Sequence, residues 1–120
     1  MHVLAMREAE LNIFRESLDL LILKALSSGP KHGYAVAEWI ERATKTTLLV
    51  DEGTLYPALH RLARRRFVDT EWGLSDNNRR AKYYAITPAG RARLRSQAPI
   101  WHRYADGIAA ALRTSANETA

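Results

Sequence analysis

Hydrophobic residues recur along this chain at two different spacings, which separate helical segments from extended ones. Residues 5–28 have the helical spacing of three and four positions, and we expect this helix either to run through Ser17 or to break near it. Its apolar face consists of Leu11, Phe14, Leu18, Leu21 and Ala25. The run Ser27-Ser28-Gly29-Pro30 ends the helix, and its proline is expected to open the next one, since proline is well tolerated in a first turn.

Two more helices follow with the same spacing. The second is predicted over residues 32–43, before a polar loop at residues 44–47, and its apolar positions are Tyr34, Val36, Ala37 and Ile40. The third is predicted over residues 51–66, because Asp51 is a good N-cap. Its buried stripe consists of Leu55, Ala58, Leu59 and Leu62. Pro57 removes a backbone hydrogen bond inside this helix, so we expect a local distortion there.

The spacing changes to strict alternation after the third helix. Residues 67–72 and 82–86 are rich in β-forming side chains, and the polar segment between them has its tip at Asp76-Asn77-Asn78. This pattern predicts a β-hairpin with a long basic loop over residues 73–81. Tyr83 and Tyr84 point to opposite faces of the second strand, so one of them is expected to pack inward.

The last helix is predicted over residues 88–113, with Thr87 as N-cap, and a frayed tail over residues 114–120. Six apolar residues have heptad-like spacing: Leu94, Ala98, Trp101, Ala105, Ile108 and Leu112. So long a stripe exceeds what a single small core needs, so we expect a two-fold dimer through this helix. The alternative is a seam packed on the protein's own first helix. Pro99 is expected to kink or break the helix near residues 97–98.

The order of elements predicts the fold class. Three helices, a β-hairpin and a long helix follow one another as in a winged helix, which is a variant of the helix-turn-helix. We therefore expect a mainly α protein with a small β-hairpin. A winged-helix DNA-binding domain would cover residues 1–87, and a dimerisation helix would cover residues 88–113.

The positive charge of the chain is concentrated in its middle. Residues 51–95 hold ten Lys/Arg and five Asp/Glu, which accounts for the whole net charge of +5. Residues 1–50 hold six of each, and residues 96–120 hold two of each. A local positive field on a small domain favours a polyanionic partner. A basic, solvated surface without a partner is the alternative.

The composition gives little support to catalysis or metal binding. The chain has no cysteine, which excludes a disulfide framework, a thiolate zinc site and a cysteine nucleophile. Its four histidines have no helical metal-binding spacing, and no glycine-rich phosphate loop is present. We therefore expect no enzyme activity, no cofactor and no metal. The longest aliphatic run, residues 20–23, is too short to cross a membrane, so we expect a cytoplasmic protein without a membrane partner.

Four segments together resemble the PadR family of bacterial transcriptional regulators, which are small winged-helix proteins. The segments are Leu18-Asp19-Leu20-Leu21-Ile22-Leu23, His32-Gly33-Tyr34, Glu52-Gly53-Thr54-Leu55-Tyr56-Pro57-Ala58-Leu59-His60-Arg61-Leu62 and Arg79-Arg80-Ala81-Lys82-Tyr83-Tyr84-Ala85-Ile86-Thr87-Pro88-Ala89-Gly90. The resemblance covers roughly residues 17–112 and is greatest to short, permease-associated members. Arg66 and Asn78 depart from it, because glycine is common at both places. The turn after the third helix is therefore expected to differ, whereas asparagine tolerates a positive φ.

The resemblance implies that the partner is double-stranded DNA and that the third helix recognises it. Its outward residues are Thr54, Tyr56, Pro57, His60, Arg61 and Arg64. The start of the second helix is implied to touch phosphate through Lys31, His32, Gly33 and Tyr34. The wing would reach the minor groove through Arg79, Arg80 and Lys82. In the alternative interpretation, the helix arginines pair with acids, the Tyr34 ring lies in the core, Tyr56 is half-buried, and the hairpin only aids solubility.

The last helix is a second candidate site. In some PadR-like proteins an aromatic residue on this helix forms part of a drug- or phenolic-binding site between subunits, which makes Trp101 the candidate contact for a small aromatic effector. The alternative is a tryptophan in the dimer core. Trp39 and Trp72 are expected to be packing residues. The function implied is a homodimeric repressor relieved by an apolar or aromatic effector; the alternatives are winged-helix binding of an acidic protein partner or of RNA.

Overall fold

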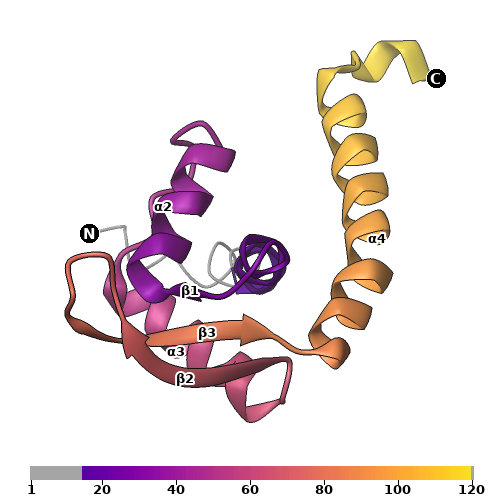
Figure 1. The fold of residues 1–120 in the computed structure, drawn as a ribbon. Coiled ribbons are helices and arrows are strands. Elements are labelled where there is room, and N and C mark those ends of the chain that lie inside the picture. Colours follow the sequence, from indigo (N-terminus) through magenta and orange to yellow (C-terminus); the bar gives the residue numbers. More distant parts are fainter. Residues whose placement is uncertain (1–14, 120) are drawn as a thin grey trace.

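A computed structural model describes residues 15–119 of the protein (Figure 1). The elements in chain order are a first helix whose described part covers residues 15–26, β1 (Lys31–His32), α2 (Gly33–Ala43), α3 (Glu52–Arg64), β2 (Val68–Leu74), β3 (Arg80–Ile86), α4 (Pro88–Arg113) and the 3-10 helix η1 (Ala116–Thr119). This order confirms the predicted winged helix, with α2 and α3 as the helix-turn-helix and β2 and β3 as the wing. The first helix does not break at Ser17. The predictions for Leu11 and Phe14 lie outside the described residues.

Two of the predicted helix caps are confirmed. The Asp51 carboxylate accepts a hydrogen bond from the backbone N–H of Thr54 at 2.9 Å, before α3. The Thr87 hydroxyl accepts one from the backbone N–H of Gly90 at 3.0 Å, before α4. Each bond satisfies a donor that the first turn of a helix leaves without a backbone partner.

The start of α2 differs from the prediction. Its N-cap is His32, whose Nδ1 accepts a hydrogen bond from the backbone N–H of Ala35 at 3.2 Å. Pro30 does not open the helix, because residues 31–32 first pair with β3 as the short strand β1. A strand of two residues is too short to produce a recognisable alternation in the sequence.

The helix α3 ends in a turn with a left-handed residue. The backbone N–H of Phe67 donates to the Leu62 carbonyl at 2.9 Å, and that of Arg66 donates to the Ala63 carbonyl at 3.0 Å. Arg66 has a φ of 65°. These are the two bonds of the Schellman motif, in which glycine is the usual left-handed residue. The turn was expected to differ from one with glycine at this position, and this is wrong. It has the usual Schellman geometry, and Arg66 adopts the left-handed conformation at some cost in strain.

The three strands form one antiparallel sheet in the order β1-β3-β2. Pairing in the hairpin extends from Val68 opposite Ile86 to Leu74 opposite Arg80. The connecting loop therefore covers only residues 75–79, and the predicted loop over residues 73–81 is too long. At its tip, Asn78 has a φ of 64°, in agreement with the tolerance expected of asparagine.

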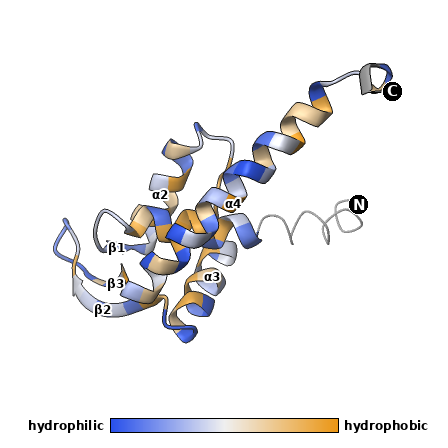
Figure 2. Cartoon of the chain, turned by 90° about the vertical axis from the view of Figure 1, so that its right-hand side faces the viewer, coloured by the Kyte–Doolittle hydropathy of each residue, from blue (hydrophilic) through white to orange (hydrophobic). Residues whose placement is uncertain are grey.

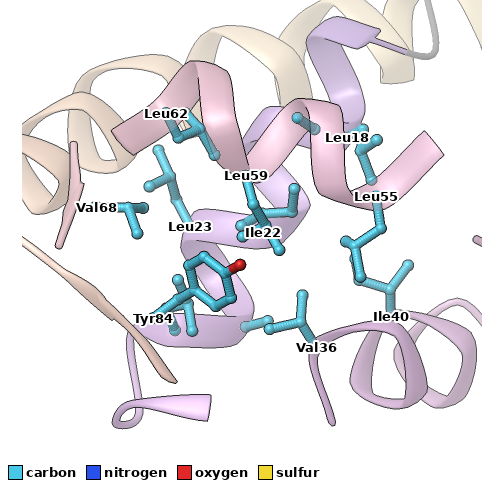
Figure 3. Close-up of a cluster of buried hydrophobic side chains, with 13 residues drawn as sticks. Leu18, Ile22, Leu23, Val36, Ile40, Leu55, Leu59, Leu62, Val68 and Tyr84 are labelled. Atoms are coloured by element: carbon cyan, nitrogen blue, oxygen red, sulfur yellow. The ribbon is translucent and has the colours of Figure 1, made fainter. Parts of the chain in front are cut away.

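The core lies where the first helix, α2 and α3 meet the sheet (Figure 3). Thirteen buried side chains form it: Leu18, Ile22, Leu23, Ala25, Leu26, Val36, Ile40, Leu55, Ala58, Leu59, Leu62, Val68 and Tyr84. The list includes the whole predicted stripe of α3. The helix α3 is continuous through Pro57. Tyr84 is the tyrosine of β3 that packs inward. Tyr34 was placed near the core by its spacing, which is wrong, since it is 67% exposed.

The helix α4 leaves the core soon after its first turn. Gly90 is its only buried residue in the part whose side chains are described, and a side chain there would collide with the Phe67 carbonyl oxygen. Pro99 does not break α4, which is assigned as one helix of 26 residues. Its second half extends away from the other described helices and the sheet (Figure 2). None of the helices in residues 15–119 has the length and hydrophobicity needed to span a bilayer.

Candidate nucleic-acid interface

The outward face of α3 carries several of the predicted contact residues. Tyr56, Pro57, His60 and Arg64 are exposed, and Thr54 is half-buried at the start of the helix. They are exposed because the opposite face, through Leu55, Ala58, Leu59 and Leu62, is held in the core. This face can offer an aromatic hydroxyl, an imidazole and a guanidinium as hydrogen-bond donors to phosphate or to base edges.

Arg61 is turned towards its own chain. Its Nη2 donates to Asp19 Oδ1 of the first helix at 2.9 Å, and both side chains are partly exposed. The alternative interpretation, in which an arginine of α3 pairs with an acid, therefore holds for Arg61. The sequence does not reveal this pair because the two residues are 42 positions apart.

Lys31 is also engaged within the chain. Its ammonium group donates to the Ala25 carbonyl at 2.8 Å and to the Ser28 hydroxyl at 3.0 Å. A lysine at this place satisfies a carbonyl at the end of the first helix and meets the negative end of its dipole. Lys31 was predicted to contact phosphate, and the structure instead gives its ammonium group a partner in the first helix.

The start of α2 lies against the recognition helix. Gly33 is buried, and a Cβ atom built there would stand 2.6 Å from the Tyr56 hydroxyl oxygen. Tyr56 is 37% exposed, and its hydroxyl oxygen and two neighbouring ring carbons are the atoms that lie against Gly33 of α2. The His32 ring stands beside the exposed Tyr34 ring, with 6.4 Å between centroids, and meets Tyr83 edge-on at 5.6 Å.

The wing presents its cations to solvent. Arg79 and Arg80 are exposed and Lys82 is half-buried. The prediction that Trp72 is a packing residue is wrong: it is 56% exposed, and the Arg80 guanidinium lies 4.6 Å from its ring centre. The sequence signal that was missed is the cross-strand pairing, which places Trp72 opposite Lys82 and two pairs away from Arg80, on the same face of the sheet. Trp39, in contrast, packs against the core as predicted.

A groove of about 840 Å³ joins these parts. Its helical side includes His32, Gly33, Tyr34 and Tyr56, and its wing side includes Trp72, Arg79, Arg80 and Lys82. Tyr84 lies at its base, where burial raises the pKa of the phenol above its ordinary value of 10.0 and the nearby Tyr56 raises it further. The groove thus combines three cations and one carboxylate, that of Asp76, with aromatic rings and hydroxyl donors. The excess of positive charge suits a phosphate backbone.

The predicted seam of α4 divides into two parts. Leu94 packs against the core, and Ala98 and Ala105 are half-buried. Farther along, Ile108 is 59% exposed and Leu112 is 82% exposed. The alternative of a seam packed on the protein's own first helix therefore fits the beginning of α4, whereas the described part of that helix, residues 15–26, leaves Ile108 and Leu112 exposed.

Trp101 stands between two hollows at the junction of the first helix and α4. One has a volume of about 330 Å³ and is lined largely by apolar groups, among them Leu20, Leu94 and Trp101. The other, of about 490 Å³, includes Trp101, Arg65 and Arg93. Within residues 15–119, no cluster of three histidine or carboxylate side chains could hold a metal ion.

Comparison with known proteins agrees with this arrangement. Residues 22–96 match the model of the transcriptional regulator PadR-like family. An uncharacterized protein X from Lysinibacillus sphaericus is 32% identical over 91 residues, which are 75% of this chain and 83% of that protein.

Solved structures with the same fold include two bacterial regulators. The structure of a transcriptional regulator from Clostridium thermocellum has a TM-score of 0.71 at 28% identity, covering 81% of this chain and 94% of its own. A PadR family transcriptional regulator from Eggerthella lenta has a TM-score of 0.68 at 29% identity, covering 89% and 91%. These proteins are transcriptional regulators and not enzymes.

Proposed function

The chain belongs to the PadR-like family of transcriptional regulators, and on that premise we propose that it is a homodimeric repressor that binds a specific operator in double-stranded DNA. We expect it to act in the cytoplasm. The observation that carries the proposal is the groove between α2, α3 and the wing, because it joins the exposed face of the recognition helix to Arg79, Arg80 and Lys82. In this arrangement α3 enters the major groove and the wing lies over the adjoining minor groove.

The far half of α4 supports a dimer. An apolar stripe that includes Trp101, Ile108 and Leu112 is exposed on α4, whose only fully buried residue in its described part is Gly90 of the first turn. Isolated helices are marginal in water, and exposed apolar stripes of this kind mark contact surfaces. A second copy packed on this stripe would give two DNA-binding heads related by a two-fold axis. The operator would then be roughly palindromic, with half-sites about one helical turn apart.

An effector, in this proposal, binds beside Trp101. The apolar hollow of about 330 Å³ lies between the first helix and α4, which are the elements that set the angle between a head and the dimer helix. A flat aromatic molecule that fills it would favour one angle over another and so lower the affinity for DNA. The test is whether such a ligand quenches tryptophan fluorescence in the wild type but not in W101L, and weakens DNA binding at the same concentrations.

The DNA proposal is tested by fluorescence anisotropy with duplex from directly upstream of the protein's own gene, against a scrambled duplex. We expect binding of the first to be tighter by about a thousandfold at near-physiological salt. R64A and R80A should each weaken it and lower the salt slope by about 0.9. R113A removes the same charge from the far end of α4 and serves as the control.

Two results would support the rival functions instead. Equal, weak and salt-sensitive binding of both duplexes would indicate a polyanion-binding surface for an acidic protein. A preference for RNA hairpins or single strands would indicate an RNA-binding winged helix.

The dimer is tested by sedimentation equilibrium of I108E and A110E. Both variants add one glutamate to an exposed position of α4, but residue 110 lies on the face opposite the stripe. We expect I108E to be monomeric and A110E to remain dimeric. A wild type that is monomeric at micromolar concentration would contradict the proposal.

A further inference from the structure

Two side chains on the wing, Trp72 and Arg80, make a close contact that the packing of the core does not require. Trp72 of β2 pairs with Lys82 of β3, and Leu74 pairs with Arg80. Cross-strand partners share a face of the sheet, so Trp72 and Arg80 are diagonal neighbours on the face that borders the groove. The Arg80 guanidinium carbon lies 4.6 Å from the centre of the indole ring, which is within the range of a cation–π contact.

The core does not need this tryptophan. Trp72 is more than half exposed and does not belong to the buried cluster or to the residues packed against it. Its position beyond Thr70, which pairs with the buried Tyr84, places it on the part of the hairpin that projects past the core. The contact that its ring makes with Arg80 is therefore its most specific feature.

The neighbouring arginine provides an internal comparison. Arg79 carries the same charge at the same end of the wing, and its backbone closes the loop by hydrogen bonds with Ser75. Among residues 15–119, its guanidinium stacks on no aromatic ring and pairs with no carboxylate. The wing thus has one arginine held against a ring and one without such support.

We propose that Trp72 is a positioning residue, which holds the Arg80 guanidinium over the groove of the protein in the orientation that enters the minor groove of the operator. This inference rests on the proposed function. An arginine that is already ordered loses less side-chain freedom on binding than one that is not. A narrow, A·T-rich minor groove attracts arginine through its negative potential. Arg80 therefore contributes more than Arg79 to affinity and to the preference for A·T pairs beside each half-site.

The stack itself is tested without DNA. In wild-type protein the ring current of Trp72 should shift the Arg80 Nε–H resonance upfield from that of Arg79, and W72A should remove this difference. W72F, which keeps an aromatic face, should keep part of it. Equal Arg79 and Arg80 shifts in the wild type would overturn the proposal, whatever the protein binds.

The role in binding is tested by two double-mutant cycles on operator DNA. W72A should lower affinity by about threefold to tenfold in the wild-type background, with the salt slope unchanged because no charge is lost. In the R80A background the same substitution should change affinity by less than about twofold, whereas in the R79A background it should keep its full effect. W72F should restore most of the loss, and W72A should weaken the preference for A·T flanks.

The outcomes separate this inference from the proposed function. A loss from W72A that is the same with or without Arg80 would mean that the indole touches DNA itself, and the positioning role would be wrong. No loss from W72A would also overturn it, provided that thermal unfolding shows an intact fold. If wild-type protein fails to distinguish operator from scrambled DNA, the proposed function fails, while the resonance comparison still decides whether the stack exists.

Discussion

The Cα atom of Gly33 lies directly against the ring of Tyr56. A Cβ atom at position 33 would be 2.6 Å from the tyrosine hydroxyl and 2.8 Å from two of its ring carbons. Real side-chain carbons do not approach so closely. The glycine at position 33 of α2 therefore determines where the Tyr56 ring of α3 can lie. The contact joins the two helices of the helix-turn-helix at the edge of the groove that we propose for DNA.

Gly33→Ala should therefore weaken DNA binding by displacing Tyr56. We expect a loss of about fivefold to tenfold, comparable to one hydrogen bond. The free energy of unfolding should change by less than about 1 kcal/mol, because the atoms that must move belong to a partly exposed side chain. Anisotropy and urea unfolding measure the two effects. In a Y56A background, G33A should cost no further affinity; an equal loss there would show that Gly33 acts on its own.

Arg61 and Arg64 should respond differently to the same substitution. R61A removes the ion pair with Asp19 and should lower the free energy of unfolding by about 0.5–1 kcal/mol. R64A should change it by less than about 0.5 kcal/mol while weakening DNA binding. D19N should reproduce the stability loss of R61A, and the double variant should lose no more than either single one. Additive losses in urea unfolding would show that the pair contributes nothing.

Arg66→Gly should stabilise the protein. Arg66 has a φ of 65° in the turn after α3, and glycine adopts this conformation without the clash of a Cβ atom. We expect the free energy of unfolding to rise by about 1 kcal/mol, partly offset by the greater freedom of glycine in the unfolded chain. R65G removes the same charge at a φ of −84° and should destabilise. Similar values for the two variants would refute the assignment of strain to Arg66.

Alkaline pH should destabilise the protein through Tyr84. Burial, and then the neighbouring Tyr56, raise the pKa of this phenol, so the folded state holds the proton more tightly than the unfolded state. Its contribution to stability is complete below the unfolded pKa of 10.0 and is lost as pH rises through the higher folded value. Y84F should lose less stability above pH 10 than the wild type. Y34F, which alters an exposed phenol, is the control, and the same alkaline loss in Y84F and Y34F would disprove the role of Tyr84.

The sequence by itself determined the helices, the wing and the buried stripe of α3. These features depend on neighbours a few positions apart: Asp51 and Thr87 each cap the helix that follows, and Leu55, Ala58, Leu59 and Leu62 recur at the helical period. The special position at Arg66 came from the family resemblance, and the change in the turn that was expected there was wrong. The backbone hydrogen bonds of the turn impose that conformation even on an arginine.

Only the tertiary structure decided which side chains of the candidate site have partners within the chain and which are exposed. In it, Arg61 forms an ion pair with Asp19, and Lys31 donates a hydrogen bond to the end of the first helix. Tyr34 lies outside the core. The tertiary structure also formed β1 and brought Arg80 over Trp72. Each of these contacts joins segments whose distance is set by helix docking or strand register, and the identity of neighbouring residues along the chain does not fix either one.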